Sequence, residues 1–327
     1  MKLVRIVLAA AAALAFGGAQ ASLTPFQQYT GNVDVSTDGW GSTSQSGVIS
    51  ASVPVGSTVI AAYLYTSTYQ NTSMGGIGAT LNGTNVGAFT SLGSLQLIPG
   101  FFLTGGRADV TSIVKPIIDG GAGGLYNFTI TETSALQDGE ALVVVYSNPA
   151  LLGTRTVGIL DGFSAITGDS ATINFSNPLD TDDPSFFAEM RLGIGFSCCS
   201  QASQVTVNGT LITNNAGNND DGAAASNGSL ITMGGFDDPF STMLPSYAND
   251  HERYNLTPLV NDGDSSISIR TLNPSNDDNI FLAVFNVLGE ANICTEDCNN
   301  VPEPMSLALI GIALAGLGLQ RPRVKRQ

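Results

Sequence analysis

The chain has 327 residues, and 27 acidic against 12 basic side chains give it a net charge of −15. Residues 22–300 contain only six Lys and Arg and carry a charge of −20, which excludes binding to nucleic acid or anionic lipid through phosphate contacts. An ordinary hydrophobic content of 43%, clustered in strand-length runs, also excludes disorder.

The first 21 residues are typical of a secretory signal peptide. Lys2 and Arg5 precede an apolar run from Ile6 to Phe16, and Ala19-Gln20-Ala21 has the small-x-small form that signal peptidase cuts. We therefore expect cleavage after Ala21, so that residues 1–21 take no part in the mature fold.

Residues 22–150 predict a module of short strands. Val48–Val53 and Tyr126–Thr131 alternate between apolar and polar side chains, whereas Val59–Tyr65 and Leu142–Tyr146 are nearly continuous apolar runs, as in strands buried on both faces. Asn82-Gly83 predicts a tight hairpin, because type I′ turns need positive φ at both central residues.

Two short segments read as helical turns. The first, Asp109–Ile118, has Asp109 or Thr111 as its N-cap and is expected to stop near Pro116. The second, Asn255–Val260, has the same form.

Four segments of the first half recur, in the same order, in the second half. The pairs are Asp38-Gly39-Trp40 with Asp161-Gly162-Phe163, Thr80–Thr84 with Thr206–Thr210, Ala108–Val114 with Tyr254–Val260, and Asp138–Tyr146 with Asp277–Phe285. Four pairs in register indicate a duplicated unit of about domain length, with residues 22–150 as the first copy and 151–292 as the second.

The second copy again predicts short strands separated by turns. They are Ala171–Phe175, Met190–Phe196, Val205–Val207, Ser266–Thr271 and Ile280–Val287. Many short strands with turn signals between them are typical of sandwiches and jelly rolls. We therefore predict an all-β fold of two tandem, related β-sandwich or jelly-roll-like modules, flanked by the signal peptide and a C-terminal hydrophobic helix.

Short loops dense in carboxylate and amide oxygens make calcium the candidate cofactor. Ca²⁺ takes six to eight oxygen ligands, and the two leading loops are 180–183 and 218–222. Ordinary turn chemistry is the competing explanation, because Asp and Asn favour turns for local reasons. The candidate ligands are Asp180, Asp182, Asp183, Asn218, Asp220 and Asp221.

Four cysteines, Cys198, Cys199, Cys294 and Cys298, suggest disulfides in an oxidising compartment. The sequence leaves all three connectivities open. Zinc is the weaker interpretation, because the spacing fits no usual finger. The last two cysteines fall in residues 293–301, which we expect to be a linker.

Catalytic candidates are few, and we predict that the chain is not an enzyme. His251 is the only histidine, it lies between Asp250 and Glu252, and no Gly-x-Ser-x-Gly sequence accompanies it. Such a histidine is more often a solvated loop residue than part of a catalytic triad. Paired carboxylates occur throughout so acidic a chain and do not by themselves indicate a glycosidase.

Residues 302–327 form a tail in three parts. Pro302 and Pro304 separate the tail from the body, and an uncharged apolar run, 305–319, follows. At 1.5 Å per residue the run spans about 23 Å as a helix, which is short for a membrane span. The basic residues that end the tail, which would stay on the cytoplasmic side, are Arg321, Arg323, Lys325 and Arg326.

The tail, with its Val301-Pro302-Glu303-Pro304 motif, resembles the PEP-CTERM sorting signal of exported proteins of Gram-negative bacteria. The resemblance implies recognition by an exosortase in the inner membrane and cleavage near the motif. The body would then be released to the cell surface or extracellular matrix. An uncut single-span anchor is the alternative, and both interpretations export the body.

These observations predict an exported surface or matrix protein with a structural, adhesive role. Its processing partners would be signal peptidase and exosortase, with polysaccharide or other surface proteins as ligands and no nucleic acid. Two alternatives remain open: a secreted hydrolase of matrix polysaccharide, and a matrix subunit that assembles in the presence of calcium.

Overall fold

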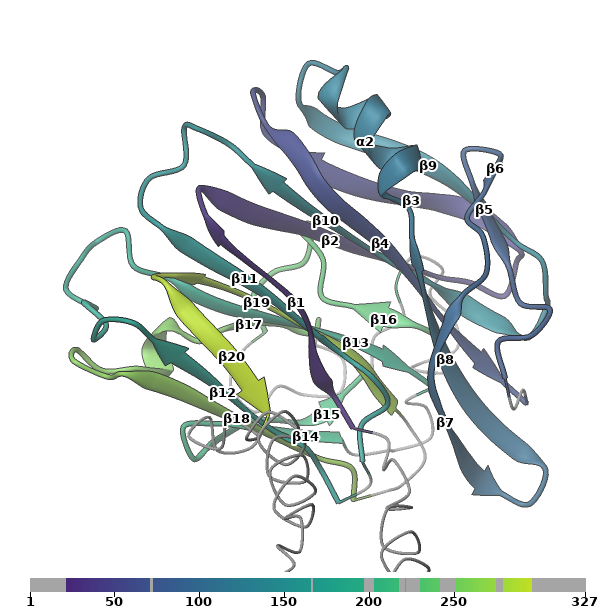
Figure 1. Cartoon of the computed structure of the whole chain (residues 1–327). Coiled ribbons are helices and arrows are strands. Elements are labelled where there is room, and N and C mark those ends of the chain that lie inside the picture. The colour runs from purple at the N-terminus through teal and green to yellow at the C-terminus, as the bar shows by residue number, and fades with distance from the viewer. Residues whose placement is uncertain are drawn as a thin grey trace, which may run out of the picture.

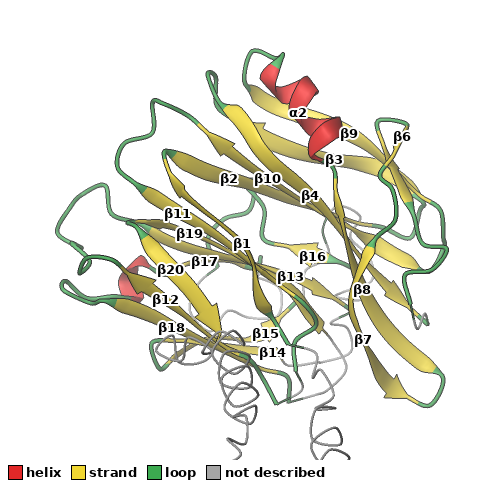
Figure 2. Ribbon diagram, viewed as in Figure 1, coloured by secondary structure: helices red, strands yellow, loops and turns green. Residues whose placement is uncertain are grey.

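The computed structural model describes residues 22–70, 73–165, 167–196, 203–217, 221, 230–241, 251–274 and 279–295. Within these ranges the chain is mostly β-strand, with one α-helix, α2 (Thr111–Asp119), and one short 3₁₀ helix, η2 (Thr257–Leu259) (Figures 1 and 2). No helix there is long and apolar enough to cross a membrane. The expected signal peptide and sorting tail lie outside the described residues.

The strands form four antiparallel sheets, which make two sandwiches of one outer and one inner sheet each. Outer sheet 1 has the order β3 (Ser46–Val53), β9 (Gly124–Glu132), β5 (Ala79–Leu81), β6 (Thr84–Asn85). Inner sheet 1 has the order β2 (Val33–Gly41), β10 (Gln137–Ser147), β4 (Thr58–Tyr69), β8 (Phe101–Asp109), β7 (Thr90–Ile98). Inner sheet 2 has the order β1 (Thr24–Gly31), β11 (Arg155–Asp161), β19 (Asn279–Leu288), β13 (Ala188–Gly195), β16 (Thr232–Met233), with β17 (Arg253–Asn255) also paired to β13. Outer sheet 2 has the order β15 (Thr210–Ala216), β14 (Ser203–Val207), β18 (Ser266–Leu272), β12 (Ser170–Phe175), β20 (Ala291–Thr295).

Three apolar cores hold these sheets in a four-layer stack (Figure 1). One core fills each sandwich, between its outer and inner sheet. The third lies between the two inner sheets, where Tyr65 and Val143 of inner sheet 1 belong to the same cluster as Ile159 and Phe281 of inner sheet 2. The inner sheets are therefore buried on both faces, which explains why their strands read as nearly continuous apolar runs.

The order of the strands confirms the duplication. In inner sheet 1 the path β2-β10-β4-β8 matches β11-β19-β13-β17 of inner sheet 2, and in the outer sheets β3-β9-β5-β6 matches β12-β18-β14-β15. The two edge strands β1 and β20 have no counterpart in the first copy. The described parts of the four recurring segments fall on, or directly next to, equivalent elements of the two sandwiches.

The two Asn-Gly turns make equivalent hydrogen bonds in the two copies. Asn82 and Asn208 have φ values of 49° and 47°. The N–H of Asn82 donates to Thr129 O (2.7 Å) while its Oδ1 accepts from Thr129 N (2.8 Å). Asn208 makes the same two bonds with Ser268, each of 2.9 Å. Each asparagine thus ties its hairpin to the neighbouring strand.

The helical turns also match, although α2 ends later than expected. The N–H of Ala62 donates to Thr111 Oγ1 (2.9 Å), and in the second copy Ala188 donates to Thr257 Oγ1 (3.0 Å). The expected stop near Pro116 is wrong, because α2 continues to Asp119. Its buried residues, Val114 and Ile118, pack into the first core, and this packing outweighs the backbone bond that a proline removes.

Both ends of the described chain join the second sandwich. β1, from the range expected to form the first module, pairs with β11 in inner sheet 2. β20 pairs with β12, so residues 293–295 are strand where a linker was expected. Ile293 packs into the second core and explains this extension.

Candidate functional site

Three arginines converge on one cavity between the two sandwiches. Arg155 (β11), Arg191 (β13) and Arg253 (β17) line a cavity of about 360 Å³, together with Asp34, Glu189, Asn286 and several apolar side chains. They are half of the six basic residues between positions 22 and 300. We call this cavity the junction pocket.

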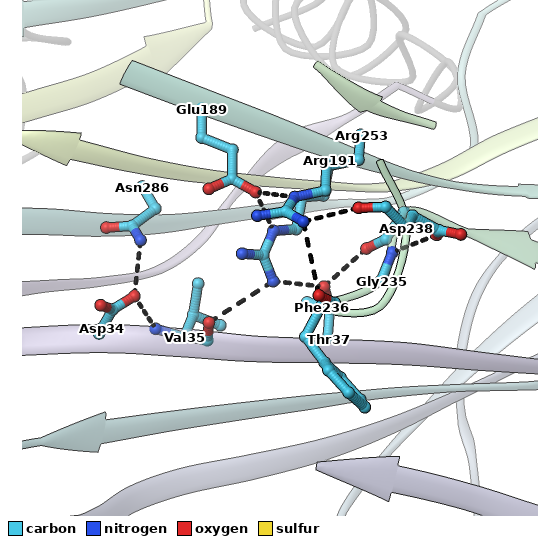
Figure 3. Close-up of polar contacts among 11 residues, drawn as sticks. Asp34, Val35, Thr37, Glu189, Arg191, Gly235, Phe236, Asp238, Arg253 and Asn286 are labelled. Atoms are coloured by element: carbon cyan, nitrogen blue, oxygen red, sulfur yellow. Dashed lines mark hydrogen bonds and ion pairs between the residues drawn. The ribbon is translucent and has the colours of Figure 1, made fainter. Parts of the chain in front are cut away.

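Glu189 is the centre of the polar network in the junction pocket (Figure 3). Its Oε1 accepts from Arg191 Nε at 2.6 Å and from Arg253 Nε at 2.8 Å. Burial alone would raise the pKa of Glu189, but the charges and hydrogen bonds of the two arginines outweigh burial and lower it. Glu189 is therefore ionised at neutral pH.

The same arginines reach across to other segments. Arg191 donates to Thr37 Oγ1 of β2 at 2.8 Å, and Thr37 in turn donates to Gly234 O at 2.6 Å. Arg253 donates to Asp238 O at 2.7 Å (Figure 3). Its guanidinium lies over the ring of Phe240. Arg191 thus links the two inner sheets by side-chain hydrogen bonds where the apolar layer between them ends.

Asp34 and Asn286 form the other wall of the junction pocket. Asp34 forms an ion pair with Arg155 and accepts from Asn286 Nδ2 at 2.7 Å. The guanidinium of Arg155 lies over the ring of Phe187, 4.8 Å from its centroid. Two buried atoms, Arg155 Nε and Asn286 Oδ1, have no hydrogen-bond partner among the described residues. Two residues that line the pocket thus each carry one buried polar atom that is left unpaired.

A second cavity, of about 640 Å³, is lined by Arg107 and Asp161, which form an ion pair. Tyr65 also donates to Asp161, at 3.0 Å, and Arg107 lies over the ring of Phe26. Burial raises the pKa of Asp161, although the arginine and the tyrosine act in the opposite direction. The charged groups of this cavity are thus engaged with each other.

A buried pair of carboxyl groups lies beside a third cavity, of about 270 Å³. Glu132 and Glu140 are hydrogen-bonded to each other, and Gln137 Nε2 donates to Glu140 Oε1 at 3.1 Å. Burial raises the pKa of Glu132 to about 8. Burial first, and then the charge of Glu132, raise the pKa of Glu140 well above its ordinary value. The pair therefore holds at least one proton at neutral pH.

Of the expected calcium ligands, the structure describes Asp180, Asp182, Asp183 and Asp221, and it does not bring Asp221 to the other three. Asp183 lies in an exposed turn, where Ser185 donates to its carboxylate from both N–H (2.8 Å) and hydroxyl (2.7 Å) and lowers its pKa. Asn218 and Asp220 lie outside the described residues. Within the described ranges no three His, Cys, Asp or Glu side chains are placed to hold a metal ion.

Asp221 instead lies near Asp38, Asp237 and Asp238. Burial, and then the charges of Asp238 and Asp38, raise its pKa well above the ordinary value. Burial, and then the charges of Asp237 and Asp238, raise the pKa of Asp38 to about 7, although Ser50 N–H donates to its carboxylate. Burial is the largest cause of both raised pKa values, and repulsion between neighbouring carboxylates adds to it.

His251 lies at the edge of this acidic group. Its Nδ1 is 3.6 Å from Asp238 Oδ1. Ser241 Oγ accepts from the backbone N–H of His251 at 2.8 Å. The hydroxyl of Ser241 is thus bonded to the main chain of the histidine.

The remaining expected sites lie mostly outside the described residues. Cys294, near the end of β20, is disulfide-bonded, and the three other cysteines fall outside these ranges. The signal peptidase site, Ala19 to Ala21, and the sorting residues from Val301 to Arg326 do so as well.

Sequence reasoning did not find the junction pocket. Its residues are spread from Asp34 to Asn286 and no two of its arginines share a motif. The one available signal was scarcity: in a body with six basic residues, each arginine is a candidate for a specific role.

Comparisons with known proteins identify no family. No protein-family model matches the chain, and no curated protein sequence is similar to it. Among solved structures, two of a glycoside hydrolase family 86 protein, BuGH86, in complex with neoagarooctaose are similar at a TM-score of 0.24 and 0.23, each with 10% identity. They cover 80% and 82% of this chain, which spans about a third of that protein (34% and 35%). TM-scores this low do not indicate a shared fold.

Proposed function

We propose that the chain is an exported protein of the cell surface or extracellular matrix, where it has a structural, adhesive role. The observation that supports the adhesive role is the chemistry of the outer sheets. On outer sheet 1, hydroxyl and amide side chains pair across strands: Ser46 donates to Thr131 Oγ1 at 3.0 Å and Ser50 to Asn127 Oδ1 at 2.9 Å. Such an uncharged, hydrogen-bonding face suits contact with the hydroxyl groups of a polysaccharide.

The stacked architecture is consistent with a structural role. The apolar layer between the inner sheets joins the two sandwiches, so both outer sheets are held at fixed positions on opposite sides of the body. Export is supported by the signal-peptide pattern and by the PEP-CTERM-like tail of the sequence.

Mass spectrometry of the mature protein, from cells with and without the exosortase, tests this proposal. We expect a mature chain that begins at Ser22, ends near Pro302–Pro304 and is found in the surface or matrix fraction. Without the exosortase, the tail should stay attached and the protein should stay in the inner membrane. An intact chain in the cytosol, uncut at both ends, would contradict the proposal.

A secreted hydrolase of matrix polysaccharide is the second candidate, and the raised pKa values of Glu132 and Glu140 favour it. The burial of the pair does not suit glycoside hydrolysis, because both side chains are buried, whereas the catalytic carboxyl groups of a glycosidase flank the bound sugar. Release of reducing ends from purified matrix, lost in Glu132→Gln, would support the hydrolase.

A further inference from the structure

We propose that the junction pocket binds a carboxylated sugar, a uronic acid unit of an acidic polysaccharide. This inference rests on the proposed matrix role and specifies the ligand. A cavity of about 360 Å³ lies in the range of sites that take small ligands, and it suits about one sugar ring.

Charge is the first argument. Among the residues that line the junction pocket, three guanidinium groups face two carboxylates, those of Asp34 and Glu189, which leaves one positive charge in excess among these side chains. This excess occurs in a body with a charge of −20. A monoanion compensates it, whereas a neutral sugar does not.

The unsatisfied atoms are the second argument. Arg155 Nε is a buried donor and Asn286 Oδ1 a buried acceptor, and neither has a partner among the described residues. Leaving such atoms unpaired is costly, so pairing them on binding is favourable. A uronic acid supplies both partners: its carboxylate accepts from the arginine, and a ring hydroxyl donates to the asparagine.

The roles of the three arginines are distinct. Arg191 and Arg253 are held by Glu189 and by bonds to neighbouring segments, so they link those segments and set the charge of the pocket. Arg155 uses one terminal nitrogen on Asp34, while Phe187 supports the plane of its guanidinium. The other N–H groups of its guanidinium can make the charge-assisted bond to a carboxylate that arginine is suited to make.

Doubly charged anions fit less well. A sulfate ion or a fully ionised phosphate ester brings acceptors but no donor for Asn286 Oδ1, and either dianion would exceed the single excess charge of the pocket. The carboxylates of Asp34 and Glu189, which also line it, would repel the second negative charge.

Calorimetric titration of the purified body tests the proposal. The probes are trigalacturonic acid, its methyl ester as a neutral ligand of nearly the same shape, and inorganic phosphate. We expect the acid to bind at low salt and to bind more weakly as salt increases, and the ester to bind at least about tenfold more weakly.

Variants test whether the acid binds in the junction pocket or elsewhere on the surface. Arg155→Gln removes the charge and should weaken binding of the acid about tenfold or more, whereas Arg155→Lys keeps the charge but loses the planar donor and should have an intermediate effect. The control is Arg270→Gln on β18, because Arg270 is exposed and does not line the junction pocket. It should bind like the wild type.

Three results would overturn the proposal: no binding of the acid by the wild type, equal binding of the acid and its ester, or unchanged binding by an Arg155→Gln protein whose circular dichroism and melting temperature match the wild type. Phosphate binding without binding of the acid would point to a different anion and would overturn it too. None of these results depends on export, so failure of the pocket is distinguishable from failure of the proposed location.

Discussion

At the scale of single residues, the most unusual feature is the carboxyl pair Glu132–Glu140 inside a protein with abundant solvated acids. Burial keeps a proton on this pair that would be lost in the unfolded chain near its ordinary pKa of about 4.5. The folded state therefore binds more protons than the unfolded state between about pH 4.5 and 8, and stability must fall as pH rises through this window.

We expect Glu140→Gln to reduce this pH dependence. The amide cannot ionise and can donate to Glu132, so the pKa of Glu132 should fall and the stability lost between pH 5 and 8 should decrease. One such group contributes a slope of up to about 1.4 kcal/mol per pH unit. Urea unfolding at several pH values measures it.

Glu290→Gln is the matched control, because Glu290 is exposed. It should leave the slope unchanged. The shared-proton interpretation fails if Glu140→Gln and the wild type lose stability in parallel as the pH rises.

At the scale of elements, the repeated Asn-Gly turns make a direct test of the duplication. Asn82→Ala should lower the free energy of unfolding by about 2 kcal/mol, because alanine is strained at positive φ and the hydrogen bond from Thr129 N is lost. Asn208→Ala should cost a similar amount, because Asn208 makes the equivalent bond to Ser268. Denaturant midpoints measure both.

Asn82→Gly separates the two contributions to this cost. Glycine adopts the same φ without strain, so this variant should be less destabilised than Asn82→Ala. Equal losses in the two variants would mean that the backbone conformation contributes nothing.

Elements with strong local signals were predictable. The alternation of Tyr126–Thr131 and the Asn82-Gly83 turn specify β9 and the β5–β6 hairpin almost without tertiary context. By contrast, β8 (Phe101–Asp109) contains Gly105-Gly106, and its conformation depends on pairing with β4. Glycine weakens a strand pattern, so sequence reasoning missed this strand.

At the scale of the whole molecule, the candidate site could not be predicted, because it exists only through the strand order. Arg155, Arg191 and Arg253 are nearly a hundred residues apart at the extremes, and the order β11-β19-β13-β17 brings them together. The duplication was visible because each copy keeps its own turns, whereas the packing of one copy against the other leaves no periodic signal.

The shared apolar layer predicts that the two sandwiches unfold together. Phe281→Ala should lower the free energy of unfolding by about 3–5 kcal/mol, because Phe281 is fully buried between the inner sheets. Scanning calorimetry should still show one transition, with the calorimetric enthalpy equal to the van't Hoff enthalpy. Leu125→Ala, at a side chain that is 59% exposed, is the control and should change stability by less than about 0.5 kcal/mol. Two separate transitions in the wild type would contradict a shared core.

The pairing of β1 with β11 has a consequence for how this protein is made. Thr24 lies opposite Asp161, so the earliest strand to leave the ribosome has no partner until more than a hundred further residues have been synthesised. A fragment that stops at residue 150 would retain β1 with a bare row of amides and carbonyls, open to pairing with other chains. We therefore expect such a fragment to aggregate. The same fragment begun at Val33, which lacks β1, should aggregate less.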